Sequence, residues 1–218
     1  MTNLRRRSLL LVLALLAASL SAAQNATPKR PTSEPYTGDL SIFESPGRDQ
    51  RLQVDRVMDI LGIEAGKNVA DIGAGSGWFT MRAARRVGPA GVVYAIDINT
   101  EAIQYIDRRA RKESLSNVRT ILSKPDDPLL PSASVDAVLL LKTYHEVSDP
   151  VMLLERLRPA LRAGARVGII DRNGNGTDHG IASKILIEEA AKAGYHLQHT
   201  YDFVKPDGVD YFLVFTAT

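Results

Sequence analysis

Short apolar runs alternate along the chain with longer segments in which apolar residues recur at helical spacing. The apolar runs predict strands at Asn68–Ile72, Val92–Ile96, Val118–Leu122, Val135–Leu141 and Ala165–Ile170. Helical spacing is found over Asp49–Leu61, Trp78–Val87, Thr100–Ser114, Pro150–Leu161 and Ile181–Ala193. Strands with so few polar positions are typical of a parallel sheet that is buried on both faces. The alternation therefore predicts a doubly wound, Rossmann-like α/β fold.

The end of the chain has a different pattern. Tyr195–Phe203 and Val209–Phe215 both have strand character, and the turn sequence Lys205-Pro206-Asp207-Gly208 lies between them. Because no helix separates these two strands, they are expected to form a hairpin. One of the two must then run antiparallel to the remainder of the sheet.

The first residues are typical of an export signal. Arg5-Arg6-Arg7 precedes an apolar run over Leu9–Leu20, and Ser21-Ala22-Ala23 offers a cleavage site before Gln24. The apolar run is shorter than the roughly 20 residues of a membrane-spanning helix. We expect a cleaved signal peptide over residues 1–23, export to the periplasm, and no stable membrane span after cleavage. An uncleaved membrane anchor and a twin-arginine route are the alternatives.

Composition is ordinary for a globular domain, at 44% hydrophobic and 24% charged residues. The formal charge is +2, from 27 Lys and Arg against 25 Asp and Glu, and the signal holds three of these arginines. The remainder is close to neutral, so nucleic acid is not an expected partner. There is no cysteine for disulfides or thiolate ligands. Residues 24–45, rich in Pro, Ser and Thr, are interpreted as a linker or N-terminal extension, and residues 46–218 as the functional domain.

A glycine-rich loop follows the first predicted strand, in the sequence Asp71-Ile72-Gly73-Ala74-Gly75-Ser76-Gly77. Glycine lacks Cβ, which allows a tight turn and a close approach of the backbone to a ligand. Asp97 follows 20 residues beyond Gly77, at the end of the next strand, where a carboxylate can accept both hydroxyl groups of a ribose. A nicotinamide nucleotide site and a glycine turn that serves only packing are the alternatives at this point.

Two residues argue against a nicotinamide nucleotide. Trp78 is bulky where the dinucleotide fingerprint places its third glycine, against the strand. Asp71 would repel a pyrophosphate, but it suits a ligand that carries ammonium and sulfonium charges.

With these features, the chain resembles the class I S-adenosylmethionine-dependent methyltransferases over about Leu52 to Phe215. Asp71–Gly77 looks like the first motif of that family, and Asp97 matches its ribose-binding acid. The resemblance implies a seven-stranded sheet whose last strand is antiparallel. It also implies that S-adenosylmethionine is the cofactor. The implied cofactor-binding residues are Asp71, Gly73, Ala74, Gly75, Gly77, Asp97 and Ile98.

Three stretches resemble, more closely, a group of exported bacterial methyltransferases of unassigned substrate. They are Phe43–Arg48, Asp126–Pro131 and Thr143–Glu146. Members of the wider family commonly place an acid just after the third strand, facing the adenine amino group. Lys124 occupies that position here, so Asp126 or Asp127 is the expected adenine contact. Solvated loop acids are the alternative.

The fourth strand ends at Leu141, so Lys142–Glu146 should border the methyl group of the cofactor. We hypothesise that His145 is a general base, because histidine can take a proton near neutral pH. Tyr144 is the second candidate catalytic residue, shaping the surroundings of His145 together with Glu146. The alternative is a histidine that caps or anchors the loop.

No metal site is predicted. Asp171–Asp178 alternates oxygen-bearing side chains before a glycine, as in the first half of a twelve-residue calcium loop. The twelfth position counted from Asp171 is Ala182, where such loops place Glu. A magnesium site like that of catechol-type methyltransferases is disfavoured, because Lys142 lies near the position at which those enzymes have an acidic metal ligand. The segment is interpreted as a flexible loop on the acceptor side, in which Asp178 or His179 contacts substrate or caps the next helix.

The sequence thus predicts an enzyme that transfers a methyl group from S-adenosylmethionine to a small-molecule or modest polar acceptor. The alternative is a non-catalytic protein that binds S-adenosylmethionine or S-adenosylhomocysteine. A nicotinamide oxidoreductase is a third and weaker hypothesis.

Overall fold

A computed structural model describes Arg30, Thr32, Tyr36 and residues 38–175, 178–205 and 208–217. The predicted signal peptide, residues 1–23, lies outside the described residues, as does half of the predicted linker over residues 24–45. Within the described part of the chain, no helix combines the length and the apolar character needed to cross a membrane.

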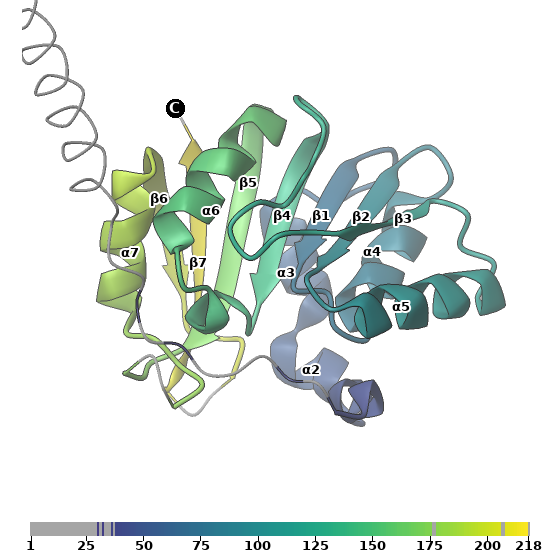
Figure 1. Cartoon of the computed structure of the whole chain (residues 1–218), viewed down its shortest axis with the longest axis horizontal. Helices are drawn as coiled ribbons and strands as arrows, with labels where there is room; N and C mark the ends of the chain where they lie inside the picture. Colours follow the sequence, from purple (N-terminus) through teal and green to yellow (C-terminus); the bar gives the residue numbers. More distant parts are fainter. Residues whose placement is uncertain are drawn as a thin grey trace, which may run out of the picture.

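One seven-stranded sheet forms the centre of the molecule, in the order β3-β2-β1-β4-β5-β7-β6 (Figure 1). Its strands are β1 (Asn68–Ile72), β2 (Val92–Asp97), β3 (Val118–Leu122), β4 (Val135–Leu141), β5 (Leu161–Arg172), β6 (Tyr195–Tyr201) and β7 (Asp210–Ala217). The first five strands pair in parallel. β7 is antiparallel to both of its neighbours, β5 and β6. The predicted α/β fold with an antiparallel strand in the C-terminal hairpin is confirmed.

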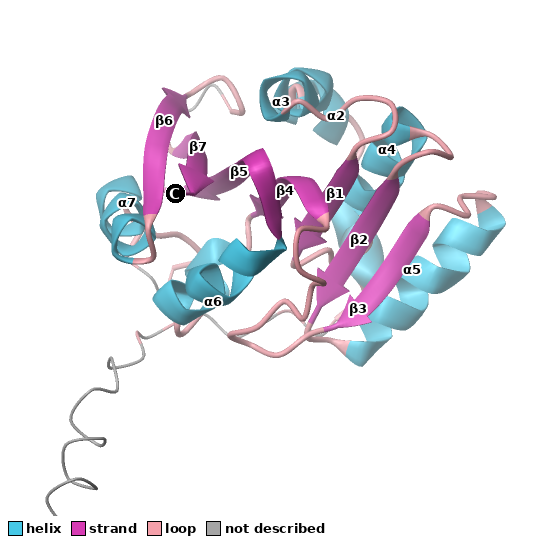
Figure 2. Ribbon diagram, turned by 90° about the horizontal axis from the view of Figure 1, so that it is seen from above, coloured by secondary structure: helices cyan, strands magenta, loops and turns pink. Residues whose placement is uncertain are grey.

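Helices cover both faces of this sheet (Figure 2). They are α2 (Arg48–Leu52), α3 (Val54–Leu61), α4 (Trp78–Val87), α5 (Thr100–Lys112), α6 (Pro150–Leu157) and α7 (Ser183–Lys192), with 3-10 turns at Leu40–Glu44, Tyr144–Glu146 and Arg158–Ala160. α3, α4 and α5 lie on one face, and α6 and α7 on the other. Each face of the sheet therefore has its own apolar cluster.

Two predicted helices are shorter or divided, and each has a local cause. The predicted helix over Asp49–Leu61 is interrupted at Gln53, whose φ of 47° is left-handed. The predicted helix from Pro150 ends at Leu157 and continues as a 3-10 turn that contains Pro159. Proline has no N–H to donate to an α-helical hydrogen bond, so the α-helix cannot continue through it.

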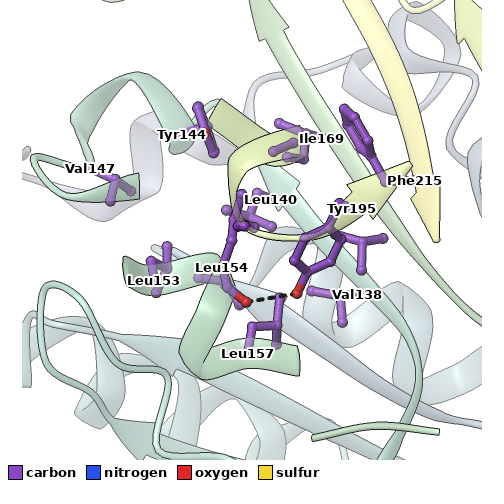
Figure 3. Packing of buried hydrophobic residues seen from close by; sticks show 14 of the residues in the cluster. Val138, Leu140, Tyr144, Val147, Leu153, Leu154, Leu157, Ile169, Tyr195 and Phe215 are labelled. Atoms are coloured by element: carbon purple, nitrogen blue, oxygen red, sulfur yellow. Dashed lines mark hydrogen bonds between the residues drawn. The ribbon is translucent and has the colours of Figure 1, made fainter. Parts of the chain in front are cut away.

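The N-terminus of α6 illustrates how local sequence fixes an element. Asp149 Oδ1 accepts a hydrogen bond from the N–H of Met152, and Pro150 occupies the first helical position. The apolar face of α6 then packs onto the sheet. Tyr195, from β6, donates its hydroxyl to the carbonyl of Leu154 at 2.9 Å, which ties α6 to the edge of the sheet (Figure 3).

We expect Leu154→Ala to destabilise the protein by about 2–5 kcal/mol, because its side chain is only 1% exposed and its removal leaves a cavity. Leu122→Ala is the matched control: Leu122 is 49% exposed, so its cost should stay within about 0.5 kcal/mol. Urea unfolding of the two variants measures both values. Equal losses in the two variants would contradict the packing described for α6.

Candidate active site

A cavity of about 1240 Å³ opens at the edge of the sheet where the parallel strands end. The parallel pairing places the carboxyl ends of β1, β2, β3, β4 and β5 at this one edge. Ligands of open α/β sheets bind at this edge. Of the predicted cofactor residues, those that line the cavity are Asp71, Gly73, Ala74, Gly75, Asp97 and Ile98. The structure thus brings together residues that are up to 27 positions apart in sequence.

The glycine loop makes a tight bend between β1 and α4. Gly73, Gly75 and Gly77 all have left-handed backbones, with φ of 73°, 54° and 74°. A Cβ on Gly73 would overlap the side chain of Thr143, which follows β4. Gly77 does not line the cavity but forms the N-cap of α4. Glycine is therefore required at Gly73 for close approach and at Gly77 for the start of the helix.

Asp97 ends β2 and holds the loop in place. Its Oδ2 accepts the N–H of Gly75 at 2.8 Å, and its Oδ1 accepts the N–H of Asn99 at 2.9 Å. Burial raises the pKa of Asp97, while the N–H groups of Asn99, Gly75 and Ile98 act in the opposite direction. The carboxylate lines the cavity next to exposed Ile98, so it can still accept hydrogen bonds from a ligand.

Asp71 is almost fully buried just before the glycine loop, with 2% of its surface exposed. Thr80 donates its hydroxyl to Oδ2 of Asp71 at 2.6 Å. Burial raises the pKa of Asp71 to about 6, against the opposing effect of the Thr80 hydrogen bonds. A positively charged ligand group beside Asp71 would favour its ionised form. The residue is therefore suited to a cationic ligand.

His145 is buried at the cavity wall and is held by Asp171 at the end of β5. Its Nδ1 lies 2.9 Å from Oδ1 of Asp171, and its backbone N–H donates to Oδ2 at 3.0 Å. Asp171 has no exposed surface. Among the described residues, Nε2 of His145 has no hydrogen-bond partner. The carboxylate therefore fixes both the backbone and the ring of His145, with Nδ1 as the protonated nitrogen.

Asp171 was missed as a partner of His145 in the sequence, where it appeared as the first residue of a possible calcium loop. Its side chain points to His145, and Asp178 Oδ1 accepts the N–H of Asn175 at 3.0 Å. These contacts give both acids a structural partner. Residues 176 and 177 of that loop lie outside the described residues.

Charged groups surround His145 in the cavity. Glu146 Oε1 is 3.7 Å from Nε2 of His145, and the ring of His179 meets the His145 ring edge to face at 5.9 Å between centroids. Burial raises the pKa of Glu146, as does the charge of Asp171, whereas His145 lowers it. Lys142 forms an ion pair with Asp210 at 2.6 Å. This part of the cavity can therefore bind polar groups of either charge.

Tyr144 does not line the cavity. Its ring is buried in the apolar cluster between the sheet and α6 (Figure 3), and its hydroxyl donates to Glu189 at 2.9 Å. Burial holds the pKa of this phenol well above its usual value. Tyr144 therefore supports the fold, and its geometry gives no support to the predicted catalytic role.

Asp126 and Asp127 also lie away from the cavity wall. Asp126 pairs with Arg156 at 2.9 Å, and Asp127 accepts the N–H of Leu129 at 2.9 Å. Ser123, Lys124 and Pro125 line the cavity at this place instead. The arrangement gives no support to an adenine contact by either acid. The predicted adenine contact rested on the order of residues after β3, and that order does not reveal which side chains point into the cavity.

The N-terminal segment contributes to the site although part of it was interpreted as a linker. Ser76, in the glycine loop, donates its hydroxyl to Glu44 at 2.6 Å, and Arg109 of α5 pairs with the same carboxylate. The guanidinium of Arg48 lies over the Trp78 ring at 4.3 Å from its centroid. Phe43 lines the cavity beside Gly75. Residues 43–48 are thus attached directly to the glycine loop.

A family model described as a methyltransferase domain matches residues 63–199. This match covers more than half of the chain, so the chain belongs to that family. It contains an S-adenosylmethionine-dependent methyltransferase domain, in agreement with the fold and with the glycine loop.

Curated relatives agree on the class of enzyme. Nocamycin O-methyltransferase of Saccharothrix syringae is 30% identical over 114 residues, which is 52% of this chain and 41% of the relative. Aklanonic acid methyltransferase DauC of Streptomyces sp. (strain C5) is 27% identical over 145 residues, 66% of each chain. The aligned region of this chain thus spans less than two thirds of either relative.

The fold is also found in a solved structure, a SAM-dependent methyltransferase from Aquifex aeolicus. The TM-score is 0.73 at 24% sequence identity, with 82% of this chain and 98% of that chain covered. At this identity the likeness concerns the fold alone.

The residues of the cavity fit S-adenosylmethionine in three respects. Gly73 keeps the loop free of a side chain, Asp71 suits positive charge, and Asp97 offers carboxylate oxygens at the end of β2. The cofactor would be held by these residues, and the acceptor would then occupy the part of the cavity near His145.

The affinity for S-adenosylhomocysteine should rise with pH across the titration of Asp71. The amino acid part of this ligand carries an ammonium group, so binding favours ionised Asp71. With a pKa of about 6, an Asp71 that must ionise on binding makes the dissociation constant about tenfold larger at pH 5 than at pH 7. Isothermal titration calorimetry at several pH values measures this dependence.

Asp71→Asn is the control for this pH profile, because an asparagine keeps the acceptor for the Thr80 hydroxyl but does not titrate. We expect weaker binding and a flat profile in this variant. Asp97→Asn should retain the slope. A wild-type profile that is flat from pH 5 to pH 7 would be inconsistent with the assigned role of Asp71.

Proposed function

We propose that the protein transfers the methyl group of S-adenosylmethionine to a small-molecule acceptor that binds against His145. The observation that carries this proposal is the His145–Asp171 pair at the wall of the cavity that the glycine loop also lines: Nδ1 is held by Asp171, and Nε2 has no hydrogen-bond partner among the described residues. One cavity therefore contains both the cofactor residues and a group able to accept a proton.

S-adenosylmethionine supplies an electrophilic methyl group when it is bound. The protein residues must then align the acceptor, and such positioning contributes roughly 7–11 kcal/mol in favourable cases. Asp171 keeps the proton of His145 on Nδ1 and fixes the ring, so that the lone pair of the ring is on Nε2. Nε2 takes the proton of an acceptor hydroxyl or amine as that group is methylated.

One feature supports a small acceptor. The cofactor and the acceptor share a single cavity of about 1240 Å³, and the N-terminal residues Tyr36 and Phe43 line it as well. Separately, one curated relative is named an O-methyltransferase, and an O–H acceptor has a proton that a base such as His145 can remove. A macromolecular acceptor would have to enter past this N-terminal segment.

Methyl transfer can be tested without knowing the acceptor. Purified protein is incubated with methyl-labelled S-adenosylmethionine and with cell extract separated into small-molecule and protein fractions. We expect enzyme-dependent label in the small-molecule fraction. Label confined to the protein fraction would overturn the proposed acceptor class, and cofactor binding without any transfer would support a non-catalytic binding protein.

Substitution of His145 should slow methyl transfer and leave cofactor binding intact. His145→Asn and Asp171→Asn each remove part of the proton-accepting pair, and general bases contribute about 10²–10⁴-fold to rates. The measurement is turnover on the labelled acceptor, with S-adenosylhomocysteine affinity as the check on folding. His199→Ala, at an exposed position of β6, is the matched control. Wild-type turnover in His145→Asn would rule out the base.

We also propose that the protein is exported and cleaved before Gln24. The support is the sequence itself: three arginines, an apolar run over Leu9–Leu20, and Ser21-Ala22-Ala23. Expressed in a bacterial host, the chain should appear in the periplasmic fraction with a mass that lacks residues 1–23. Ala23→Arg should block cleavage, because signal peptidases require a small residue at that position. A full-length wild-type chain in the cytosol would contradict export.

A further inference from the structure

Three potential metal ligands meet at the acceptor side of the cavity. His145, Glu146 and His179 each offer one ligand atom, and these atoms all lie within 4.8 Å of one another. The separation of Nε2 of His145 from Oε1 of Glu146 is 3.7 Å. Two ligands at about 2.0–2.2 Å from one tetrahedral ion are separated by a similar distance. Only small side-chain movements would bring all three atoms to a common ion.

His145 has the environment of a metal ligand. Its ring is buried, with 3% of the residue exposed, and Nε2 finds no hydrogen-bond partner in the described part of the chain. A buried polar atom without a partner is costly and calls for an explanation. On the other side of the ring, Nδ1 is held by Asp171 at 2.9 Å. A carboxylate on the second nitrogen is the usual support of a metal-binding histidine.

His179 approaches from a different element. It precedes α7, it is exposed, and its φ of 56° is left-handed. The cluster therefore joins a buried ligand, His145, held by Asp171 at the end of β5, to an exposed ligand that precedes α7.

We propose that His145, Glu146 and His179 bind a divalent first-row transition metal ion, with Zn²⁺ as the probe. Two imidazoles and one carboxylate form a donor set suited to Zn²⁺, Co²⁺ or Fe²⁺, whereas Mg²⁺ and Ca²⁺ take oxygen ligands. The sequence predicted no metal site, because the three ligands form no continuous motif and nothing in the sequence indicates that His179 folds back onto His145.

Metal binding and proton acceptance use the same lone pair of Nε2. A bound ion therefore withdraws His145 from the role of base, and the two states exclude each other. For this reason the metal site is tested by binding and not by turnover. Failure to bind a metal ion would not contradict the proposed methyl transfer. Failure to transfer a methyl group would not contradict the metal site.

The experiment uses untagged full-length protein that has been treated with a chelator and dialysed. Co²⁺ is titrated while visible absorption is recorded, because Co²⁺ bound by nitrogen and oxygen ligands of the protein absorbs differently from the hydrated ion. Zn²⁺ binding is then measured by calorimetry. We expect one ion per chain, and Zn²⁺ should displace Co²⁺ and abolish its spectrum.

Three variants assign the ion to the cluster. His179→Ala and Glu146→Gln each remove one ligand and should weaken Zn²⁺ binding at least about tenfold. Asp171→Asn should weaken binding about 10–100-fold by releasing the ring of His145. His179→Ala changes an exposed side chain outside the apolar clusters, so its fold should be retained; S-adenosylhomocysteine binding checks this.

The matched control is the double variant His196→Ala/His199→Ala. It removes the other two histidines of the chain, both exposed on β6, and should keep one tight ion per chain. Loss of binding in this control would assign the ion to β6 and overturn the proposal. Unchanged Zn²⁺ affinity in both His179→Ala and Glu146→Gln, or no binding by the wild-type protein, would overturn it as well.

Discussion

Parallel pairing of five strands is the constraint on which the site depends. It brings the carboxyl ends of β1, β2, β4 and β5 to one edge, and an acidic residue stands at or near three of these ends: Asp71, Asp97 and Asp171. Each carboxylate is satisfied by a group from another segment: the Thr80 hydroxyl, the Gly75 N–H or the His145 ring. The acids thus connect the segments that form the cavity, and two of them, Asp71 and Asp97, line it.

Much of the fold and the cofactor half of the site could be predicted from the sequence, because the signals are local. The glycine loop, Asp71 and Asp97 lie in or directly after strands whose apolar character is plain. Their positions relative to one another follow from parallel pairing alone. The hairpin at the end of the chain was predictable for the same reason, since a turn sequence separates two apolar runs with no helix between them.

The part of the cavity around His145 could not be predicted in the same way, because it depends on side-chain direction in irregular segments. Tyr144 and His145 are adjacent, yet one is buried in the core and the other lines the cavity, and the three-residue 3-10 turn that holds them is too short to show a periodic pattern in the sequence. The bond from His145 to Asp171 joins residues 26 positions apart. The N-terminal residues that reach the glycine loop do so through polar contacts such as Ser76 to Glu44, which leave no apolar pattern.

The reversed direction of β7 has a consequence for how this enzyme could diversify. Because β7 starts where β5 ends, the connection from β6 emerges at the ligand edge, and Val204, Lys205 and Asp210 line the cavity. A parallel strand in that place would begin at the opposite edge. The glycine loop and Asp97 thus come from the first part of the domain, and the wall formed by Val204, Lys205 and Asp210 comes from the last. Under the proposed function, substitutions in that closing connection would alter substrate choice while the glycine loop stays intact.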